Sequence, residues 1–325
     1  MTPSMLRRTS TAAAALVSAV ALVACGGSGS PSSASSASGS GSGAAAKPGK
    51  GKPAVTIGDK NFTEEFLLGQ LYSQALEAKG FTVHLKPDIG SSEITDKALT
   101  GGQIDMYPEY TGEIVLTIKG DTKAQPTTAL QTYQLAQRFE SSRGFALLKA
   151  TPFYDTNEMA VMPSFAAKWH LSTIGDLIHV GNKASKVVYG DTPENKGRYA
   201  GLLGLQKAYG LANIQFKALA IGLQYQAIQQ GAINMADVFS TDAQLQQVHL
   251  KILSDPKHIF GFQNVAPVVS KKVLAAEGPA FAQTLNAVSA DLTIPVMQKL
   301  NAAVAINKLQ PAAVAKKFLQ ANHLD

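Results

Sequence analysis

The sequence has almost no thiol chemistry, because its 325 residues include a single cysteine, Cys25. A lone cysteine forms no disulfide within the chain, so the folded part must be stabilised by burial of apolar side chains, for which the chain is long enough. The sequence also lacks the clustered thiols, histidines or carboxylates that hold zinc or calcium. We therefore expect neither a metal site nor a cofactor.

Catalytic motifs are absent as well. The sequence contains no HExxH or HxH arrangement, no GxSxG elbow and no P-loop. Single scattered histidines are mostly surface groups or satisfied core groups. The protein is therefore not expected to be an enzyme. The scattered histidines are His84, His170, His179, His249, His258 and His323.

Charge is sparse, since only 16% of the residues are charged and the formal net charge is +6. A nucleic-acid-binding protein normally concentrates basic side chains on one face or helix. The only concentration here is a few lysines in the low-complexity stretch before the folded part. Composition thus argues against a nucleic-acid partner.

Long hydrophobic runs are missing too. Residues 12–24 are apolar and small, too few to cross a bilayer, and they follow Arg7 and Arg8. This arrangement is typical of a secretory signal peptide. The run ends in L-V-A followed by Cys25, which resembles the bacterial lipobox, where the cysteine is acylated. We expect residues 1–24 to be the signal peptide; the alternative is an incidental cysteine inside an uncleaved helix.

A low-complexity stretch comes next. Residues 26–53 are almost entirely Gly, Ser, Ala, Pro and Lys, which provide no side chains for a core. Such a stretch is typical of a flexible linker. Residues 25–53 are therefore predicted to tether a folded body that begins near Ala54.

From Ala54 onward, strand-like and helix-like patterns alternate, which predicts an α/β fold with mainly parallel sheets. A body of this length is expected to divide into two lobes. The expected strands are 55–57, 81–85, 103–106, 159–162, 187–189 and 233–239. The expected helices start after Asn61 and after Ser91 or Ser92, and cover 201–209, 225–230, 281–292 and 312–321.

Two segments indicate a ligand site. In the first, Lys60 lies between a strand and a helix start, where free N–H groups favour an anionic ligand group. Asn61 is expected to cap that helix, with Glu64 completing a capping box. In the second, Ser91 opens a helix and Tyr110 follows a strand, where an aromatic face suits a cation. The alternatives are a surface lysine on a turn and ordinary core tyrosines.

Both segments resemble the signatures of substrate-binding proteins from osmoprotectant ABC importers, which take up glycine betaine, carnitine or choline. The matching runs include I-D-M-Y-P-E-Y-T-G, G-L-L-G-L-Q-K-A-Y-G, F-S-T-D and A-P-V-V, and they extend in order over residues 54–322. The resemblance implies a type II periplasmic-binding-protein fold, with two α/β lobes joined by a hinge. Lobe I is expected at 54–155 plus 261–325, and lobe II at 156–260.

The resemblance also implies ligand-binding residues. In the family, tyrosines surround a quaternary ammonium while basic groups hold the carboxylate. Lys60 and Arg198 match the basic groups, and Tyr110 matches a cage tyrosine. Three expected cage tyrosines are replaced, by Asn157, Phe239 and a residue near Gln263.

Two further departures add carboxylates, because Glu65 replaces a glutamine and Glu113 replaces a threonine. One hypothesis is a ligand that carries both a carboxylate and a hydrogen-bonding cation, such as an amine or a modified amino acid, with both glutamates pairing with that cation. The alternative is that they face solvent or cap helices. Missing ring faces are also available from Tyr154, Tyr199 or Tyr225.

The function predicted from the resemblance is capture of a small quaternary ammonium or zwitterionic osmolyte for an ABC importer. Its partners are then the permease and ATPase subunits, and the membrane through the lipid anchor on Cys25. The protein is expected to be a monomer outside the cytoplasm. Alternatives are a changed ligand specificity or a ligand-sensing receptor.

Overall fold

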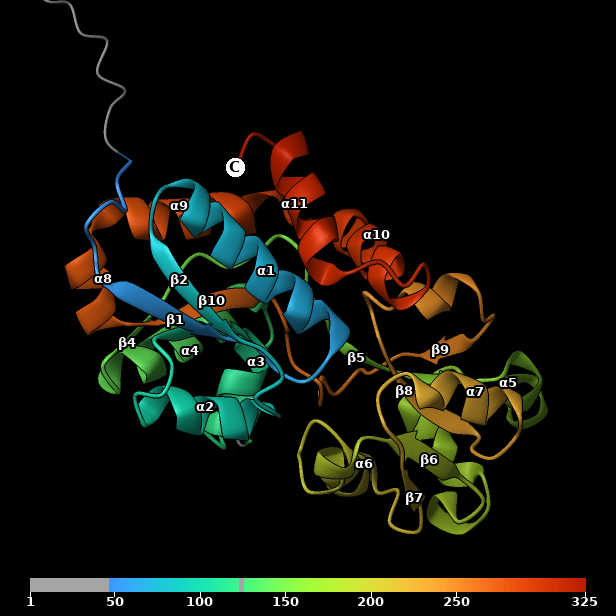
Figure 1. Cartoon of the computed structure of the whole chain (residues 1–325). Helices are drawn as coiled ribbons and strands as arrows, with labels where there is room; N and C mark the ends of the chain where they lie inside the picture. Colours follow the sequence, from blue (N-terminus) through green and yellow to red (C-terminus); the bar gives the residue numbers. More distant parts are fainter. Residues whose placement is uncertain (1–46, 123–125) are drawn as a thin grey trace, which may run out of the picture. The chain divides into compact units, whose positions relative to one another are not determined.

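The computed structural model describes residues 47–122 and 126–325 (Figure 1). The predicted signal peptide and Cys25 lie outside the described residues. Within the described part of the chain, no helix combines the length and apolar character required to cross a membrane.

The described chain forms two five-stranded sheets, each with helices packed on it. The first sheet has the order β2-β1-β3-β10-β4. Its strands are β1 (Ala54–Gly58), β2 (Thr82–Lys86), β3 (Met106–Tyr110), β4 (Phe145–Leu147) and β10 (Val265–Ser270). The second sheet has the order β7-β6-β8-β5-β9. Its strands are β5 (Asn157–Val161), β6 (Val188–Asp191), β7 (Gln215–Ala218), β8 (Met235–Phe239) and β9 (Lys251–Leu253).

The two sheets have the same pattern of strand directions. In each, three neighbouring strands run parallel, and two antiparallel pairings follow. The expectation of mainly parallel sheets was therefore wrong, since half of the pairings are antiparallel. The antiparallel pairings all involve β5 and β10. These are the first strands that the chain forms after it crosses from one sheet to the other, and each is antiparallel to both of its neighbours.

Helices cover both faces of the first sheet (Figure 1). On one face lie α1 (Thr63–Ala78), α9 (Pro279–Asp291), α10 (Ile294–Ala305) and α11 (Pro311–Ala321); the other elements are α2 (Ser92–Thr100), α3 (Thr111–Glu113), a π-helical turn (Ile114–Ile118), α4 (Ala129–Ser142) and α8 (Lys271–Glu277). The second sheet carries α5 (Pro163–Trp169), α6 (Leu202–Tyr209) and α7 (Leu223–Gln229), with 3₁₀ turns at Ile174–His179, Asn182–Ala184, Pro193–Lys196 and Ala243–Gln246.

Each sheet has its own apolar core. Under α1, the side chains of Leu67 and Leu71 are fully buried with Ile57 of β1 and Phe281 of α9. Burying a side chain of this size stabilises the fold by about 1.5–3 kcal/mol. Another cluster forms around Tyr189 in the second sheet. These cores hold the strand ends, and therefore the residues that follow them, in fixed positions.

Two local predictions were wrong. Helix α1 has Phe62 as its N-cap, without a side-chain capping bond, so Asn61 and Glu64 form no capping box. The strand expected from residue 103 begins only at Met106. Asp105, just before this strand, is joined to Thr56 of β1 by two hydrogen bonds of 2.8 Å: its backbone N–H donates to the Thr56 carbonyl, and its carboxylate accepts the Thr56 N–H.

Candidate functional site

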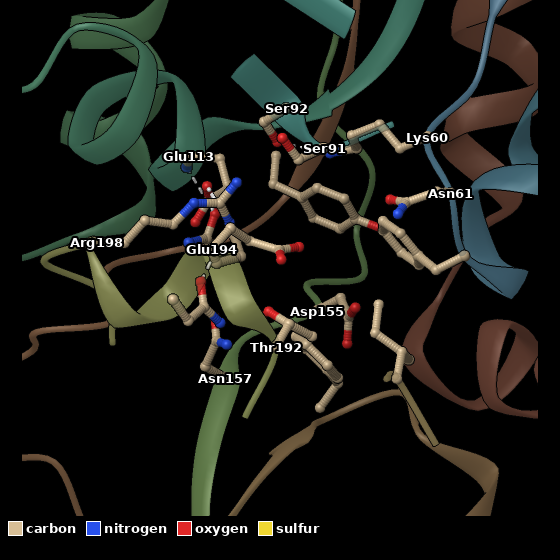
Figure 2. A pocket seen from close by; sticks show the side chains of 16 residues that line it. Lys60, Asn61, Ser91, Ser92, Glu113, Asp155, Asn157, Thr192, Glu194 and Arg198 are labelled. Atoms are coloured by element: carbon tan, nitrogen blue, oxygen red, sulfur yellow. Dashed lines mark hydrogen bonds and ion pairs between the residues drawn. The ribbon is translucent and has the colours of Figure 1, made fainter. Parts of the chain in front are cut away.

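A pocket lies where the ends of strands from both sheets meet (Figure 2). Every ligand-binding residue predicted from the sequence lines it, except Glu65. Figure 2 shows Arg198 and Glu113 together on one side, with Lys60 and Asn61 across the pocket. The lining consists of Lys60, Asn61, Phe62, Ser91, Ser92, Tyr110, Glu113, Asp155, Asn157, Thr192, Glu194, Asn195, Arg198, Ile221, Phe239 and Gln263.

Lys60 follows β1 and is held by acidic partners of its own sheet. Its ammonium pairs with the Glu109 carboxylate of β3, lies 3.3 Å from the Ser92 hydroxyl, and is 3.8 Å from Glu65. Burial by itself lowers the pKa of this ammonium, but the charges of Glu109 and Glu65 raise it above its ordinary value. Lys60 therefore remains charged and is already neutralised by the protein.

Glu65 lies behind Lys60 and is fully buried. Its carboxylate accepts the backbone N–H of Lys60 at 3.3 Å. Burial raises the pKa of Glu65 and of Glu109, while the Lys60 charge opposes that shift. Glu65 thus has a partner within the protein, Lys60, and it is not among the residues that line the pocket.

Aromatic faces stand next to Lys60. The rings of Phe62 and Tyr110 are stacked, with centroids 6.1 Å apart and planes inclined by 27°. The Lys60 ammonium is 4.3 Å from the Tyr110 centroid. The Tyr110 hydroxyl donates to Glu64 at 2.7 Å, which fixes the ring. Phe239, at the end of β8, contributes an aromatic ring from the second sheet.

Arg198 belongs to the part of the chain that forms the second sheet, and its side chain contacts residues that lie beside the first sheet. Its Nε and Nη2 donate to Glu93 at 2.9 and 2.5 Å, and its Nη1 donates to Asn195 at 3.2 Å. Glu113 lies 3.5 Å from Nη1. Burial alone would lower the pKa of Arg198, but these carboxylates raise it above its usual value.

Gln263 and Glu113 meet beside a glycine. The Gln263 side-chain oxygen accepts the backbone N–H of Glu113 at 3.0 Å, and its amide nitrogen donates to the Phe260 carbonyl. A Cβ on Gly112 would lie 2.6 Å from Gln263, so this contact requires glycine. Gln263 therefore positions the turn that carries Glu113.

Asn157 and Asp155 bring polar groups from the segment that enters the second sheet. Asn157 donates to the buried Asp237 at 2.8 Å. Asp155 accepts the Thr241 hydroxyl at 2.6 Å, and burial raises the pKa of Asp155 well above its ordinary value. Both residues are therefore held in place before any ligand arrives.

The sequence interpretation missed several lining residues, notably Phe62, Asp155, Thr192 and Glu194. Phe62 directly follows Lys60 and Asn61 in the sequence, so its aromatic ring was an available signal. Thr192 follows Gly190 and Asp191 as Lys60 follows Gly58 and Asp59, a likeness that had also been available.

The three alternative ring donors do not line the pocket. Tyr225, for example, donates its hydroxyl to Asp242 at 2.6 Å. Across residues 47–122 and 126–325, no group of three or more Cys, His, Asp or Glu side chains is arranged to hold a metal ion. The pocket therefore offers two paired cations, two stacked rings, a further ring and several carboxylates.

Comparisons with known proteins show which proteins this chain resembles. The family described as "Substrate binding domain of ABC-type glycine betaine transport system" matches residues 53–321. A glycine-betaine-binding protein of Pseudomonas aeruginosa is 31% identical over 277 residues, covering 82% of this chain and 88% of that protein. An ergothioneine transport permease/ergothioneine binding protein, EgtU of Helicobacter pylori, is 29% identical over 83% of this chain and 47% of its own length.

A solved structure extends the likeness to three dimensions. Apo YehZ from Escherichia coli is 30% identical, has a TM-score of 0.60, and is covered over 99% of its length by 84% of this chain. The predicted α/β solute-binding-protein fold is thereby confirmed.

Proposed function

Since this chain belongs to the family of substrate-binding domains of ABC-type glycine betaine transport systems, we propose that its pocket captures a quaternary ammonium or zwitterionic osmolyte outside the cytoplasm. The observation that carries this proposal is the stacked pair of Phe62 and Tyr110 rings, which line one pocket together with the carboxyl groups of Glu113 and Asp155. A desolvated cation over an aromatic face gains about 2 kcal/mol or more.

Delivery to a membrane permease driven by an ATPase subunit completes the proposed role. Ligand binding between two lobes is expected to close them by a hinge motion. The protein performs no covalent step, and it acts as a monomer. Binding is reversible, because cation–π contacts and ion pairs are non-covalent. The same aromatic pocket therefore both captures and releases the ligand.

The proposed lobes are 54–155 plus 261–325 and 156–260. Their support is the change of sheet between β4 and β5 and again between β9 and β10. The chain thus crosses twice, close to residues 155 and 261, and the two crossing segments are the proposed hinge.

A lipid on Cys25 is the proposed membrane anchor. Its support is the apolar run of residues 12–24 that ends at Cys25 and the linker that follows. The test is incorporation of a clickable fatty acid during expression in bacteria. Label on the native protein and none on Cys25→Ser is expected; equal labelling of both refutes the anchor.

Ligand capture is tested by thermal unfolding of residues 47–325 with glycine betaine, carnitine, choline, ergothioneine and common amino acids. A ligand present at 100 times its Kd adds about 2.7 kcal/mol of stability. At least one quaternary ammonium compound is expected to raise Tm, whereas a panel without any such shift contradicts the proposal.

Two variants locate the binding site. Tyr110→Leu removes the ring and is expected to weaken binding of the active compound by about 30-fold, equivalent to about 2 kcal/mol. Tyr110→Phe keeps the ring and is expected to bind within about threefold of the native protein. Phe216→Leu, on β7 and outside the pocket lining, is the matched control. Equal losses for Tyr110→Leu and Phe216→Leu would exclude this pocket.

A further inference from the structure

The ion pair between Glu93 and Arg198 joins two parts of the chain 105 residues apart. Glu93 lies in the first turn of α2, beside the first sheet, whereas Arg198 follows the 3₁₀ turn Pro193–Lys196 of the second sheet. The guanidinium presents Nε and Nη2 side by side to the two oxygens of Glu93. This two-bond geometry is the one by which arginine recognises a carboxylate, including a ligand's.

Arg198 has little capacity left for a second carboxylate. Of its five N–H groups, Nε and one on Nη2 bind Glu93, and Nη1 faces both Asn195 and Glu113. A ligand carboxylate that sought the same paired donors would have to displace Glu93. The Ser91 hydroxyl, which donates to Glu93 at 2.6 Å, holds that carboxylate in place.

Lys60 is occupied in the same manner. Its ammonium has three donors, and its neighbours are Glu109, Ser92 and Glu65, with the Tyr110 ring on a further side. Lys60 and Arg198 are the two cationic side chains among the described residues that line the pocket. Both are therefore neutralised within the protein.

The remaining charge in the pocket is acidic. Glu194 and Asp155 line it in addition to Glu113, which together with Glu93 neutralises Arg198. Burial raises the pKa of Asp155 well above its ordinary value, so among the described lining residues the unpaired negative charge is that of Glu194. A ligand carboxylate would add negative charge to a partly buried site that already has more acidic than basic groups, which is unfavourable at low dielectric. A ligand that carries only positive charge meets the rings and carboxylates without that penalty.

We propose that Glu93 is a specificity-determining residue: by occupying Arg198 it makes the pocket select organic cations without a carboxylate over zwitterions. Choline and glycine betaine differ in this respect, since both carry a trimethylammonium group and only glycine betaine carries a carboxylate. The inference rests on the proposed function, because it assumes that the pocket binds quaternary ammonium compounds.

The pair is expected to persist over the physiological pH range. Partial burial by itself raises the pKa of Glu93, but hydrogen bonds from Arg198 and Ser91 lower it to about 2. The contribution of this ion pair to the free energy of unfolding is present at pH values above the unfolded pKa of glutamate, near 4, and is lost as the pH falls toward the folded pKa of about 2. The Glu93–Arg198 ion pair is therefore expected to stay charged between pH 5 and pH 8.

The test is isothermal titration calorimetry of choline and glycine betaine with the native protein and two variants. The native protein is expected to bind choline at least tenfold more tightly than glycine betaine. Glu93→Gln removes the competing charge, so it should narrow that ratio at least fivefold, mainly by tighter betaine binding. Glu77→Gln, an exposed change on α1, is the matched control and should leave the ratio unchanged.

The double variant Glu93→Gln/Arg198→Gln tests whether the freed arginine is the group that binds the carboxylate of betaine. It should lose the gain in betaine affinity that Glu93→Gln shows. A double variant that keeps this gain shows that Glu93 does not act by occupying Arg198, and this overturns the proposal.

Other results are equally decisive. Tighter binding of betaine than of choline by the native protein, or an unchanged ratio in Glu93→Gln, refutes the role of Glu93 and leaves osmolyte capture intact. Failure of both compounds to bind, with Tm unmoved by the whole panel, refutes the proposed function and this inference together.

Discussion

The two sheets are built alike where their first parallel strands point toward the pocket. Gly58 and Asp59 come at the end of β1, and Gly190 and Asp191 come at the end of β6. A Cβ on Gly58 would lie 2.7 Å from the end of Ile104, and one on Gly190 would lie 2.5 Å from the end of Ile233. Each glycine thus lets its strand pack closely against an isoleucine that precedes the next parallel strand.

A second correspondence concerns the residue after each isoleucine. Asp105 accepts the backbone N–H of Thr56 at 2.8 Å, and Asn234 accepts that of Val188 at 2.5 Å. In both sheets a short polar side chain therefore completes the hydrogen bonding between two parallel strands.

The sheets differ beyond these strand ends. The first provides Lys60, Phe62 and Tyr110, whereas the second provides Thr192 and Phe239 at the corresponding places. The residues that position the strands recur, and those that face the ligand do not. The two sheets thus share the residues that position their strands and differ in the side chains that line the pocket.

The largest effect is expected from the two cations, one on each half. Lys60→Met leaves Glu109 and Glu65 buried without their partner, which should cost about 3–5 kcal/mol. Arg198→Met should cost about 1 kcal/mol, because the Glu93 side chain is 39% exposed and can be solvated. Urea unfolding measures the free energy of unfolding of both variants.

As a control, adding Glu109→Gln to Lys60→Met should recover part of the lost stability, because it removes one of the unpaired buried charges. Equal losses for Lys60→Met and Arg198→Met would contradict the expected difference between a buried and a partly exposed ion pair.

The paired glycines offer the next test. Gly58→Ala and Gly190→Ala force a methyl group against packed isoleucines, and each should cost about 1–3 kcal/mol. In Gly175→Ala the new methyl group meets its nearest neighbour at an ordinary 3.5 Å, so this control should change stability by less than about 0.5 kcal/mol. If only one of the first two variants is destabilised, the sheets are not equivalent at this point.

The paired aspartates predict a pH dependence of stability. Burial raises the pKa of Asp59 to about 7 and that of Asp191 to about 6. A carboxyl group whose pKa is higher in the folded than in the unfolded protein favours folding while it is protonated. This contribution to the free energy of unfolding is fully present below the unfolded pKa, near 4, and is lost as the pH rises through the folded pKa. Between pH 5 and pH 8 the native protein should lose about 2–3 kcal/mol relative to Asp59→Asn and about 1–2 kcal/mol relative to Asp191→Asn.

Urea titrations at the two pH values measure this dependence, and the intrinsic cost of each substitution cancels in the difference. A native protein that gains stability against both variants over that range would show the opposite sign and exclude raised pKa values at these positions.

The smallest effect is expected at the polar residues that connect the strands. Asp105→Ala and Asn234→Ala each remove an acceptor and should cost about 1 kcal/mol. Asp105→Asn and Asn234→Asp keep an acceptor, so each should stay within about 0.5 kcal/mol of the native protein. Thermal unfolding distinguishes the two groups, and a swap as costly as its alanine variant would disprove the shared role.

Much of the fold was predictable because its signals are local. The alternation of apolar residues located β1, α6, α9 and α11 to within a few residues, since each pattern repeats with the period of its own element. The cap of α1 was not predictable in this manner, because the N-cap is Phe62, which forms no side-chain capping bond, and Asn61 lines the pocket. The direction of β5 and β10 likewise depends on where the chain crosses between sheets.

The sequence by itself determined which chemical groups this protein brings to its pocket, because Lys60, Tyr110, Glu113 and Arg198 stand at recognisable strand and helix ends. Only the tertiary structure decided which of those groups remain available to a ligand. The partner of Lys60 is 49 residues away and the partner of Arg198 is 105 residues away. Pairing of charges depends on distance in space, and sheet pairing and the meeting of the two sheets set that distance.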